Sequence, residues 1–333
     1  MVPKKQQMAV IGAGLMGHGI ALTLARAGQY VTLTDPHEET LKSAPKRISD
    51  SLKSLGAAED EIARALKMIE LCSSVRAAVK EADVVFEAAP EKLDLKRKIF
   101  AEVEEHAPKE AVLASNTSVI QITRIMEGLN LRERALGTHW WNPPHMIPLV
   151  EVIKTEWTDA AVADRMMALL ASAGKTPVMV EKDVPGFIGN RLQHALWREA
   201  VSLVERGICD AEAVDTVVKS CFGRRLAVLG PLENADLVGT DLTLDIHENV
   251  LFDLESRQGP SPYLRQLVQE GKLGMKSGEG FRTWTEAEAD AARARRGARR
   301  QLVVATPAPR GLGAARPRDA PRRVRGGARR AAS

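Results

Sequence analysis

Hydrophobic and polar positions in the first half of the chain follow two alternating patterns, short apolar runs and longer amphipathic segments. The apolar runs predict strands at Met8–Ile11, Tyr30–Thr34, Asp83–Ala89, Ala111–Leu113, Gly137–Trp141, Val150–Ile153 and Pro177–Val180. Helical spacing predicts helices within Pro36–Leu71, where Gly56 makes a break, and over Lys92–His106. This alternation is typical of an α/β fold with a doubly wound, mostly parallel sheet.

The pattern becomes entirely helical after Pro185. Helices are predicted over Phe187–Glu205, Ala211–Ser220 and Asp241–Leu254. We therefore expect a doubly wound domain at residues 1–184 and an all-helical domain at residues 185–296. Because an apolar helical domain of this kind commonly buries one face against another subunit, we also expect a homodimer.

The net charge of +4 is distributed unevenly. From Arg293 to the end, thirteen Arg and a single acid, Asp319, give +12, which leaves −8 for all other residues. The segment 297–333 is rich in Arg, Ala, Pro and Gly and contains neither Lys nor aromatic residues, so we expect a disordered tail rather than a nucleic-acid or membrane arm. Because GC-rich DNA read in a wrong frame encodes this composition, we hypothesise that the tail is frameshifted or artificial.

The remaining bulk properties exclude several classes of protein. No uninterrupted apolar run is long enough to span a bilayer, and no signal-type segment opens the sequence, so a cytoplasmic protein without membrane partners is expected. The three cysteines, Cys72, Cys209 and Cys221, lack C-x-x-C spacing and indicate neither a disulfide framework nor a metal site.

A glycine-rich turn follows the first predicted strand. Gly12-Ala13-Gly14-Leu15-Met16-Gly17 fits G-x-G-x-x-G, the turn of a Rossmann-type domain. Gly12 permits the tight turn, Gly14 lets the backbone approach a pyrophosphate, and Gly17 lets the following helix close onto the strand. We therefore predict that Gly12, Gly14, Leu15, Met16 and Gly17 contact a dinucleotide at the helix N-terminus.

Asp35 ends the second predicted strand, at about the distance from the turn that dinucleotide-binding domains show. A carboxylate at this position accepts hydrogen bonds from the adenosine ribose diol and repels a 2′-phosphate. The predicted cofactor is therefore NAD rather than NADP. The alternative is a doubly wound domain without a dinucleotide.

His139 is the candidate general base, because it lies at the C-terminal end of a predicted strand, where ligands bind in open α/β sheets. Glu151 begins the next strand and could hold the imidazole ring, leaving the other ring nitrogen free to take a proton. Ser118 and Asn190 are polar groups that could reach the same cleft, although each could equally be a cap or a satisfied core residue. Ser115 and Thr117 are typical of cap and turn positions.

Six segments resemble the L-3-hydroxyacyl-CoA dehydrogenase family over nearly all of residues 8–285. They are GAGLMGHGIA, FEAAPEKLDLK, SNTS, the block from HWWNPP to LVEVI, DVPGFIGNR and GKLGMKSGEGF. The resemblance implies His139 as base, Glu151 as its partner, and Ser118 and Asn190 as contacts of the substrate's oxygens. For NAD it implies the turn residues together with Asp35, Glu91, Lys96, Ser118, Asn142 and Lys276.

The sequence departs from the family where the carrier of the substrate would bind. Ser51 matches a CoA-contacting position, but a lysine position is occupied by Ala58, and Glu59 begins an acidic run. Lys53 is the nearest remaining cation. Because phosphate recognition depends on cations, this segment weakens the case for CoA.

The segments around Asn190 and around Phe222–Glu233 are closer to a branch that oxidises small free hydroxy acids, such as carnitine and gulonate dehydrogenases. Arg191, Arg224 and Arg225 are therefore candidates for binding a substrate carboxylate, although each could be a surface residue. Trp140 and Trp141 replace the family's usual aromatic pair and could narrow the pocket.

We predict NAD-dependent oxidation of a short-chain L-3-hydroxyacyl-CoA to its 3-keto form, as in fatty acid metabolism. A dehydrogenase of a small free 3-hydroxy acid is the alternative substrate class. A non-catalytic NAD-binding protein is the alternative of another kind.

Overall fold

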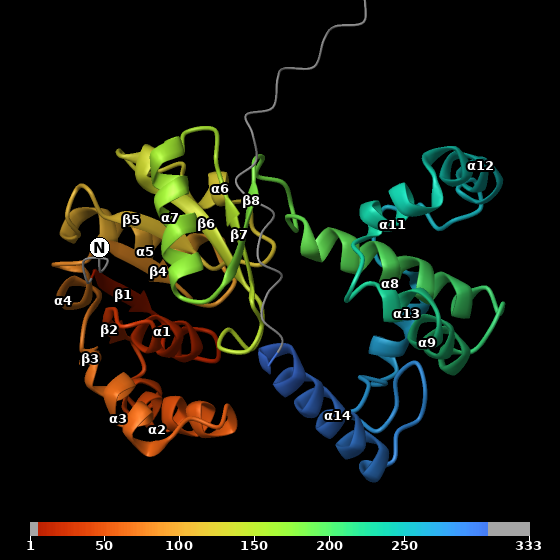
Figure 1. The fold of residues 1–333 in the computed structure, drawn as a ribbon, viewed down its shortest axis with the longest axis horizontal. Coiled ribbons are helices and arrows are strands. Elements are labelled where there is room, and N and C mark those ends of the chain that lie inside the picture. Colours follow the sequence, from red (N-terminus) through yellow and green to blue (C-terminus); the bar gives the residue numbers. More distant parts are fainter. Residues whose placement is uncertain (1–5, 306–333) are drawn as a thin grey trace, which may run out of the picture.

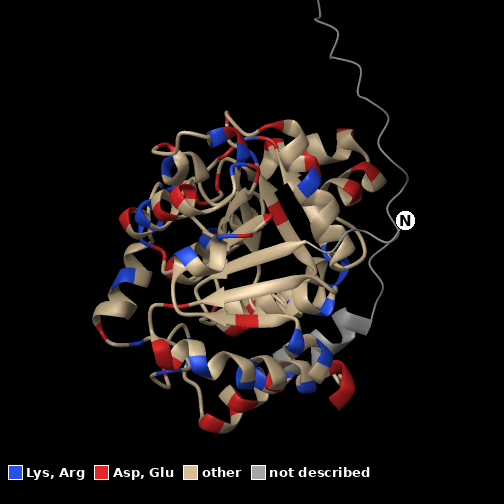
Figure 2. Cartoon of the chain, turned by 90° about the vertical axis from the view of Figure 1, so that its left-hand side faces the viewer, with Lys and Arg blue, Asp and Glu red and all other residues tan. Residues whose placement is uncertain are grey.

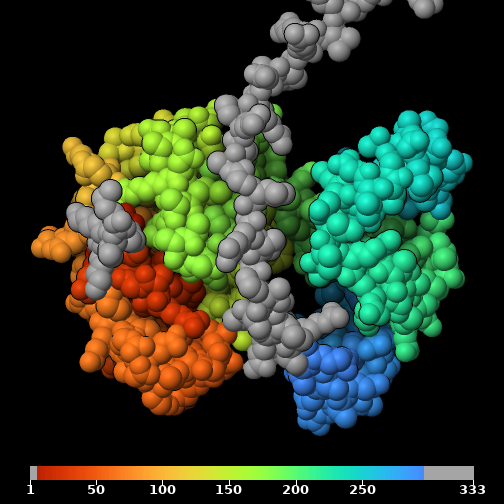
Figure 3. Space-filling model, viewed as in Figure 1, coloured from red at the N-terminus to blue at the C-terminus, as the bar shows by residue number. Residues whose placement is uncertain are grey.

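The computed structural model describes residues 6–305, with side chains as far as residue 295, and divides them into two lobes (Figure 1). The first lobe contains a sheet between helices, and the second contains helices alone. Figure 3 shows the same two lobes in space-filling form, the second coloured green to blue. The predicted boundary near residue 185 falls in the segment that joins the last strand to the first helix of the second lobe.

Eight strands form the sheet in the order β3-β2-β1-β4-β5-β6-β7-β8. Their bounds are β1 (Gln7–Ile11), β2 (Tyr30–Thr34), β3 (Ile69–Cys72), β4 (Val84–Glu87), β5 (Val112–Ser115), β6 (Ala135–Trp140), β7 (Leu149–Ile153) and β8 (Thr176–Val180). Neighbouring strands are parallel except for β6 and β7, which are antiparallel. The predicted α/β class and mostly parallel sheet are confirmed.

Helices cover both faces of this sheet. Their bounds are α1 (Gly17–Arg26), α2 (Glu38–Ser54), α3 (Glu59–Lys67), α4 (Val75–Val79), α5 (Leu93–His106), α6 (Ile122–Met126) and α7 (Ala160–Ser172). One core cluster joins α1, α2 and α7 to the sheet, and a second joins α4, α5 and α6 to it. Acidic and basic residues are interspersed over the outer helices, while the strands between them are almost free of charge (Figure 2).

One prediction for this lobe was wrong, because the helical stretch assigned to 36–71 contains the end strand β3. In the structure, residues Ile69 to Cys72 form β3, which pairs in parallel with Val31 to Thr34 of β2. A run of four residues is too short for its own periodicity to distinguish a strand from a helix. Pairing with β2, a long-range contact, decides the conformation.

The second lobe contains α8 (Gly189–Glu205), α9 (Ala211–Ser220), α10 (Phe222–Arg225), α11 (Pro231–Val238), α12 (Thr240–Val250), α13 (Pro262–Gln269) and α14 (Glu286–Ala305). The predicted all-helical character is confirmed, although α12 ends four residues before the predicted Leu254. Large apolar side chains on α9, α11 and α12 lie open on the surface, and these helices bury none of their residues.

The C-terminal tail differs from its prediction at its start. Helix α14 runs to Ala305, so residues 297–305, which we expected to be disordered, are helical. The rest of the predicted tail, 306–333, lies outside the described residues. Within residues 6–305 no helix is both long and apolar enough to cross a bilayer.

Candidate active site

The glycine turn between β1 and α1 has the shape that a pyrophosphate requires. Gly12 has φ +98°, and a Cβ atom there would lie 2.7 Å from the carbonyl oxygen of Ala88. A Cβ atom at Gly17 would lie 1.6 Å from the carbonyl oxygen of Gly12. Above Gly14, by contrast, no atom lies within 4 Å of an added Cβ, so the backbone there is open to a ligand. The residues present therefore fit the dinucleotide predicted from the sequence.

Three side chains from other elements fix this turn. Asp35, at the end of β2, accepts a hydrogen bond from the Ala13 amide at 2.8 Å. Arg47 on α2 donates to the carbonyl oxygens of Ala13 at 2.7 Å and Gly14 at 3.3 Å. His18 places Nδ1 2.8 Å from the Gly14 oxygen, and burial lowers the pKa of its imidazole. Sequence reasoning missed Arg47 and His18, because no motif links a surface-type helix residue to the turn.

His139 and Glu151 form a buried pair at the carboxyl edge of the sheet. They are direct partners in the antiparallel register of β6 and β7, and His139 Nδ1 lies 2.7 Å from Glu151 Oε2. Their residues are 3% and 1% exposed, so this contact is shielded from water.

The other carboxylate oxygen of Glu151 is bound by the first helix of the second lobe. Glu151 Oε1 accepts hydrogen bonds from the amides of Ile188 at 2.8 Å and Gly189 at 3.0 Å, at the start of α8. Burial alone would raise the pKa of Glu151, but these amides and His139 outweigh it and hold the pKa below its ordinary value. Glu151 is therefore ionised at neutral pH and can orient and charge-balance the imidazole.

Aromatic rings enclose the histidine. The ring centroids of Trp141 and Phe187 lie 5.1 Å and 5.5 Å from that of His139. Trp141 also packs against the first turn of α8, where a Cβ atom at Gly189 would lie 2.4 Å from its Cζ2.

His139 lines a cavity of about 320 Å³. The cavity brings together six residues that were predicted from the sequence as site residues: Met16, Glu91, Ser118, His139, Asn142 and Asn190. Trp140 and Trp141 also line it. The cavity contains a base, several hydrogen-bonding groups and an apolar wall, which is the composition of a small-molecule site.

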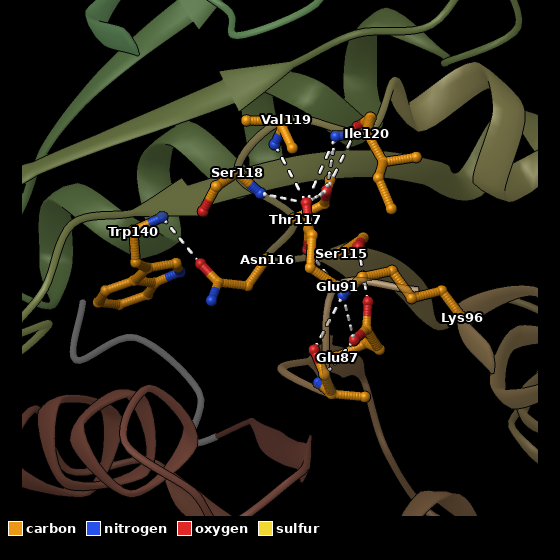
Figure 4. Close-up of polar contacts among 11 residues, drawn as sticks. Glu87, Glu91, Lys96, Ser115, Asn116, Thr117, Ser118, Val119, Ile120 and Trp140 are labelled. Atoms are coloured by element: carbon orange, nitrogen blue, oxygen red, sulfur yellow. Dashed lines mark hydrogen bonds and ion pairs between the residues drawn. The ribbon is translucent and has the colours of Figure 1, made fainter. Parts of the chain in front are cut away.

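Glu91 holds the Ser118 loop in place (Figure 4). Its Oε1 accepts hydrogen bonds from the Thr117 hydroxyl and from the amides of Ser118 at 3.0 Å and Val119 at 3.1 Å. Burial alone would raise the pKa of Glu91, but these hydrogen bonds and the charge of Lys96 lower it by more, so the pKa lies below its ordinary value. Asn190 secures the same loop from α8, because its amide donates to the Ser118 carbonyl oxygen at 2.9 Å.

Lys96 differs from its prediction as a direct cofactor contact. Its side chain is 0% exposed, and Nζ donates to Glu87 Oε1 at 2.8 Å and to the Ala89 carbonyl oxygen at 3.1 Å (Figure 4). Ser115 donates to the other oxygen of Glu87 at 2.6 Å. Lys96 therefore supports the strand end beside the cavity from inside the protein.

The segment predicted to meet a CoA nucleotide is acidic and its cation is paired. Lys53 Nζ lies 3.2 Å from Glu59 Oε1 on the surface. Ala58 is the N-cap of α3, whose first turn is Glu59, Asp60 and Glu61. Ser51 lies inward, with its hydroxyl 3.4 Å from His18 Nε2.

The structure does not bring four other predicted residues to the cavity. Lys276 and Arg191 line a separate groove of about 1260 Å³ within the helical lobe. Arg224 and Arg225 lie exposed on α10. The roles predicted for these four residues in binding NAD or substrate therefore stay predictions, since all four lie on the helical lobe and none lines the cavity. In the described part of the chain, no three His, Cys, Asp or Glu side chains are grouped as metal ligands.

Comparison with known proteins agrees with this geometry. Residues 7–184 match the NAD-binding domain of 3-hydroxyacyl-CoA dehydrogenase, and residues 186–284 match the C-terminal domain of the same family. A probable 3-hydroxybutyryl-CoA dehydrogenase of Bacillus subtilis is 37% identical over 84% of this chain and 98% of its own length.

A second kind of relative matches more of the chain. The 5-formyl-3-hydroxy-2-methylpyridine 4-carboxylate 5-dehydrogenase of Mesorhizobium japonicum is 36% identical over 90% of this chain and 96% of its own length. A crystal structure of a dehydrogenase with this substrate name, described as an NAD⁺-dependent dismutase, has a TM-score of 0.81 and 34% identity over 90% of this chain and 97% of that one. The glycine turn, the two-lobe fold and these matches together show that the chain belongs to the 3-hydroxyacyl-CoA dehydrogenase family of NAD-dependent oxidoreductases acting on CH–OH groups.

Proposed function

We propose that this oxidoreductase acts on a small hydroxy acid with a free carboxylate, and that His139 is its general base. The observation that carries the proposal is the buried His139–Glu151 pair, which faces a cavity of about 320 Å³ lined by hydrogen-bonding groups. The amides of α8 hold one oxygen of Glu151, and the other oxygen contacts Nδ1 of His139. The second ring nitrogen of His139 is then left for the substrate. This arrangement suits removal of a hydroxyl proton.

The chain's own residues account for binding and proton transfer. When bound, NAD supplies the acceptor for the hydride that leaves the carbinol carbon. His139 takes the hydroxyl proton at Nε2, and ionised Glu151 stabilises the imidazolium that forms. Ser118 and Asn190 border the same cavity and orient the substrate oxygen, while Trp141 and Phe187 limit water around the imidazole.

The choice of a free acid rests on the electrostatics of the segment 51–61, called the acidic rim below, where the family resemblance would place a CoA nucleotide. A CoA nucleotide carries several phosphate charges and is bound through cations. Here Lys53 is paired with Glu59, and the first turn of α3 adds two more acids. The match to a pyridine carboxylate dehydrogenase, which covers more of the chain than the match to the Bacillus subtilis protein, favours a substrate with a free carboxylate.

A CoA thioester is the second candidate. Ser51 is retained and held by His18, and the family relatives include 3-hydroxybutyryl-CoA dehydrogenases. Under this alternative the nucleotide would follow another path past the acidic rim.

Substrate turnover decides between the two classes. We would measure NADH formation with 3-hydroxybutyryl-CoA, with 3-hydroxybutyrate, carnitine and gulonate, and with the formylpyridine carboxylate. We expect kcat/KM for at least one free acid to exceed that of the thioester by about tenfold or more, which corresponds to a difference of about 1.4 kcal/mol in transition-state binding. Turnover of the thioester alone would overturn the proposed substrate class.

A variant of the rim provides a matched control for this assay. Ala58→Lys places a cation beside Lys53 without touching the cavity. If the rim excludes CoA, the variant should gain about tenfold in kcat/KM for the thioester and keep its activity on free acids. No gain would show that the rim does not determine the carrier.

We also propose that a second copy of the chain covers the helical lobe. Exposed apolar side chains gather on α11, α12 and the turn after it, with Leu232 79%, Leu237 71% and Phe252 83% exposed. A surface of this kind usually marks a protein interface. A two-fold pair would bury the same face from both copies.

A further inference from the structure

We infer that Lys175 is a positioning residue for NAD binding, because it fastens the loop 141–148 that begins with the cavity residues Trp141 and Asn142. Lys175 follows α7 and directly precedes β8, at the same edge of the sheet as His139. The inference rests on NAD as the cofactor and on the proposed place of Asn142 beside it, and it does not depend on the substrate class.

The ammonium group of Lys175 reaches into the loop. Nζ donates to the carbonyl oxygens of Pro144 and, at 3.0 Å, of Ile147. It also lies 5.3 Å from the centroid of the Trp140 ring, within the range of a cation–π contact. One side chain therefore joins the middle and the end of the loop to the last residue of β6.

The loop has few other means of holding its shape. Three of its residues, Pro143, Pro144 and Pro148, have no amide hydrogen to donate. The amides of Met146 and Ile147 both donate to the Pro143 oxygen, each at 3.0 Å, which leaves the Pro144 and Ile147 oxygens to Lys175. Unpaired buried carbonyl groups are costly, so removal of the ammonium would free the loop.

The far side of the loop touches the dinucleotide helix. A Cβ atom at Gly19 of α1 would lie 3.0 Å from Pro144 Cδ and 3.2 Å from His145 Nδ1. The rings of His145 and His18 are 6.2 Å apart, and His18 in turn contacts the glycine turn. The loop is thus clamped between Lys175 and α1, with Asn142 at its start facing the cavity.

Among the side chains that the structure describes, no carboxylate forms an ion pair with Lys175. Burial alone lowers its pKa, to about 8, and no charged group opposes the shift. Buried Lys96, in contrast, is paired with Glu87 at 2.8 Å. A partly buried ammonium held only by carbonyl groups weakens the fold, and such a feature is typical of a functional site.

The test is the affinity of Lys175→Met for NAD, measured by calorimetric titration and by steady-state kinetics. We expect Kd and KM for NAD to rise about tenfold, while kcat at saturating NAD stays within about twofold. The melting temperature should change little, because the lost hydrogen bonds to Pro144 and Ile147 oppose the gain from removing a half-buried charge. Lys175→Arg, which keeps the charge, should restore NAD affinity to within about threefold of the wild type.

Lys154→Met is the matched control, since Lys154 follows β7 at the opposite end of the same strand pair and forms a surface ion pair with Glu181 at 3.3 Å. It should bind NAD like the wild type. An unchanged Kd in Lys175→Met, or an equal loss in kcat, in both KM values and in melting temperature, would overturn the inference. Asn142→Ala tests the proposed place of Asn142 separately, because unchanged NAD affinity there contradicts that contact alone.

Hydrogen exchange in the wild-type protein provides a test that needs no variant. The amides of Met146 and Ile147 should exchange more slowly with NAD present than without it, because the cofactor would order the loop that Lys175 holds. Equal exchange rates would contradict a link between the loop and the cofactor.

Discussion

The carboxyl edge of the sheet and the helical lobe differ in how their side chains are partnered within the chain. At the sheet edge, the buried charges are paired within the chain, Glu87 with Lys96 and Glu151 with His139. On α9, α11 and α12 no residue is buried, and large apolar side chains face outward. The first region pairs its charges within one chain, whereas the second exposes an apolar surface, which we propose that a second copy of the chain covers.

The two regions meet at the residues proposed for catalysis. The start of α8 donates two amides to Glu151, and Asn190 donates to the carbonyl oxygen of Ser118. The orientation of the helical lobe is therefore linked to the carboxylate that holds His139. We infer that chemistry depends on the carboxyl edge of the sheet with its pairs Glu87–Lys96 and Glu151–His139, called the paired edge. Assembly depends on the exposed apolar surface of α9, α11 and α12, called the open face.

The largest effect is expected at the paired edge, from His139→Gln. Without a general base, kcat should fall by a factor of about a hundred to ten thousand, while Kd for NAD stays near the wild-type value, because the glycine turn is untouched. His106→Gln, at the end of α5 in the sheet lobe, is the control and should keep full turnover. Turnover by His139→Gln at the control's rate would show that His139 is not the base.

The next effect is expected on the open face, from Leu237→Asp. A charge in the centre of an apolar interface should raise the dimer dissociation constant by about a hundredfold or more, which light scattering after size-exclusion chromatography would detect. Leu71→Asp introduces the same charge on β3 of the sheet lobe, where the leucine is also exposed. If both variants and the wild type elute as the same species, the helical lobe is not the interface.

A smaller effect should follow from weakening the paired edge at Glu91. In Glu91→Gln a neutral amide replaces the carboxylate that accepts from Thr117, Ser118 and Val119, and its NH₂ group faces Lys96. We expect kcat/KM to fall about tenfold, since hydrogen bonds to charged groups are the stronger ones. Glu102→Gln, exposed on α5, should leave kcat/KM unchanged. If kcat/KM of Glu91→Gln is unchanged as well, the Ser118 loop keeps its conformation without the Glu91 carboxylate.

Local patterns in the sequence explain which parts of the site could be predicted. The glycine turn and Asp35 lie within one strand-turn-helix-strand unit, so their positions follow from spacing alone. His139 and Glu151 were predicted as a pair because each lies on a short apolar strand, and the antiparallel register of those strands then sets them opposite each other.

Long-range contacts explain what the sequence did not disclose. Arg47 reaches the glycine turn from α2, and Lys175 reaches the loop 141–148 from the start of β8, so neither belongs to a motif. Lys96 fits a family pattern, yet its burial against Glu87 is a property of packing. β3 was taken as helix because its four residues acquire their conformation from β2.

The smallest expected effect concerns Lys175, a half-buried cation at the paired edge that has no carboxylate partner among the described side chains. Its pKa is about 8 in the folded protein against 10.5 ordinarily, so between these pH values the unfolded chain binds more protons than the folded one. The free energy of unfolding should therefore rise with pH across this window, by at most about 2 kcal/mol because the side chain keeps some solvent contact. Urea unfolding of the wild type and of Lys175→Met, compared across the window, isolates this contribution, since all other groups titrate alike in both. If the difference in unfolding free energy between the two proteins stays constant with pH, the ammonium of Lys175 is as well solvated as that of a surface lysine. The paired edge would then contain no cation that is buried without a carboxylate partner.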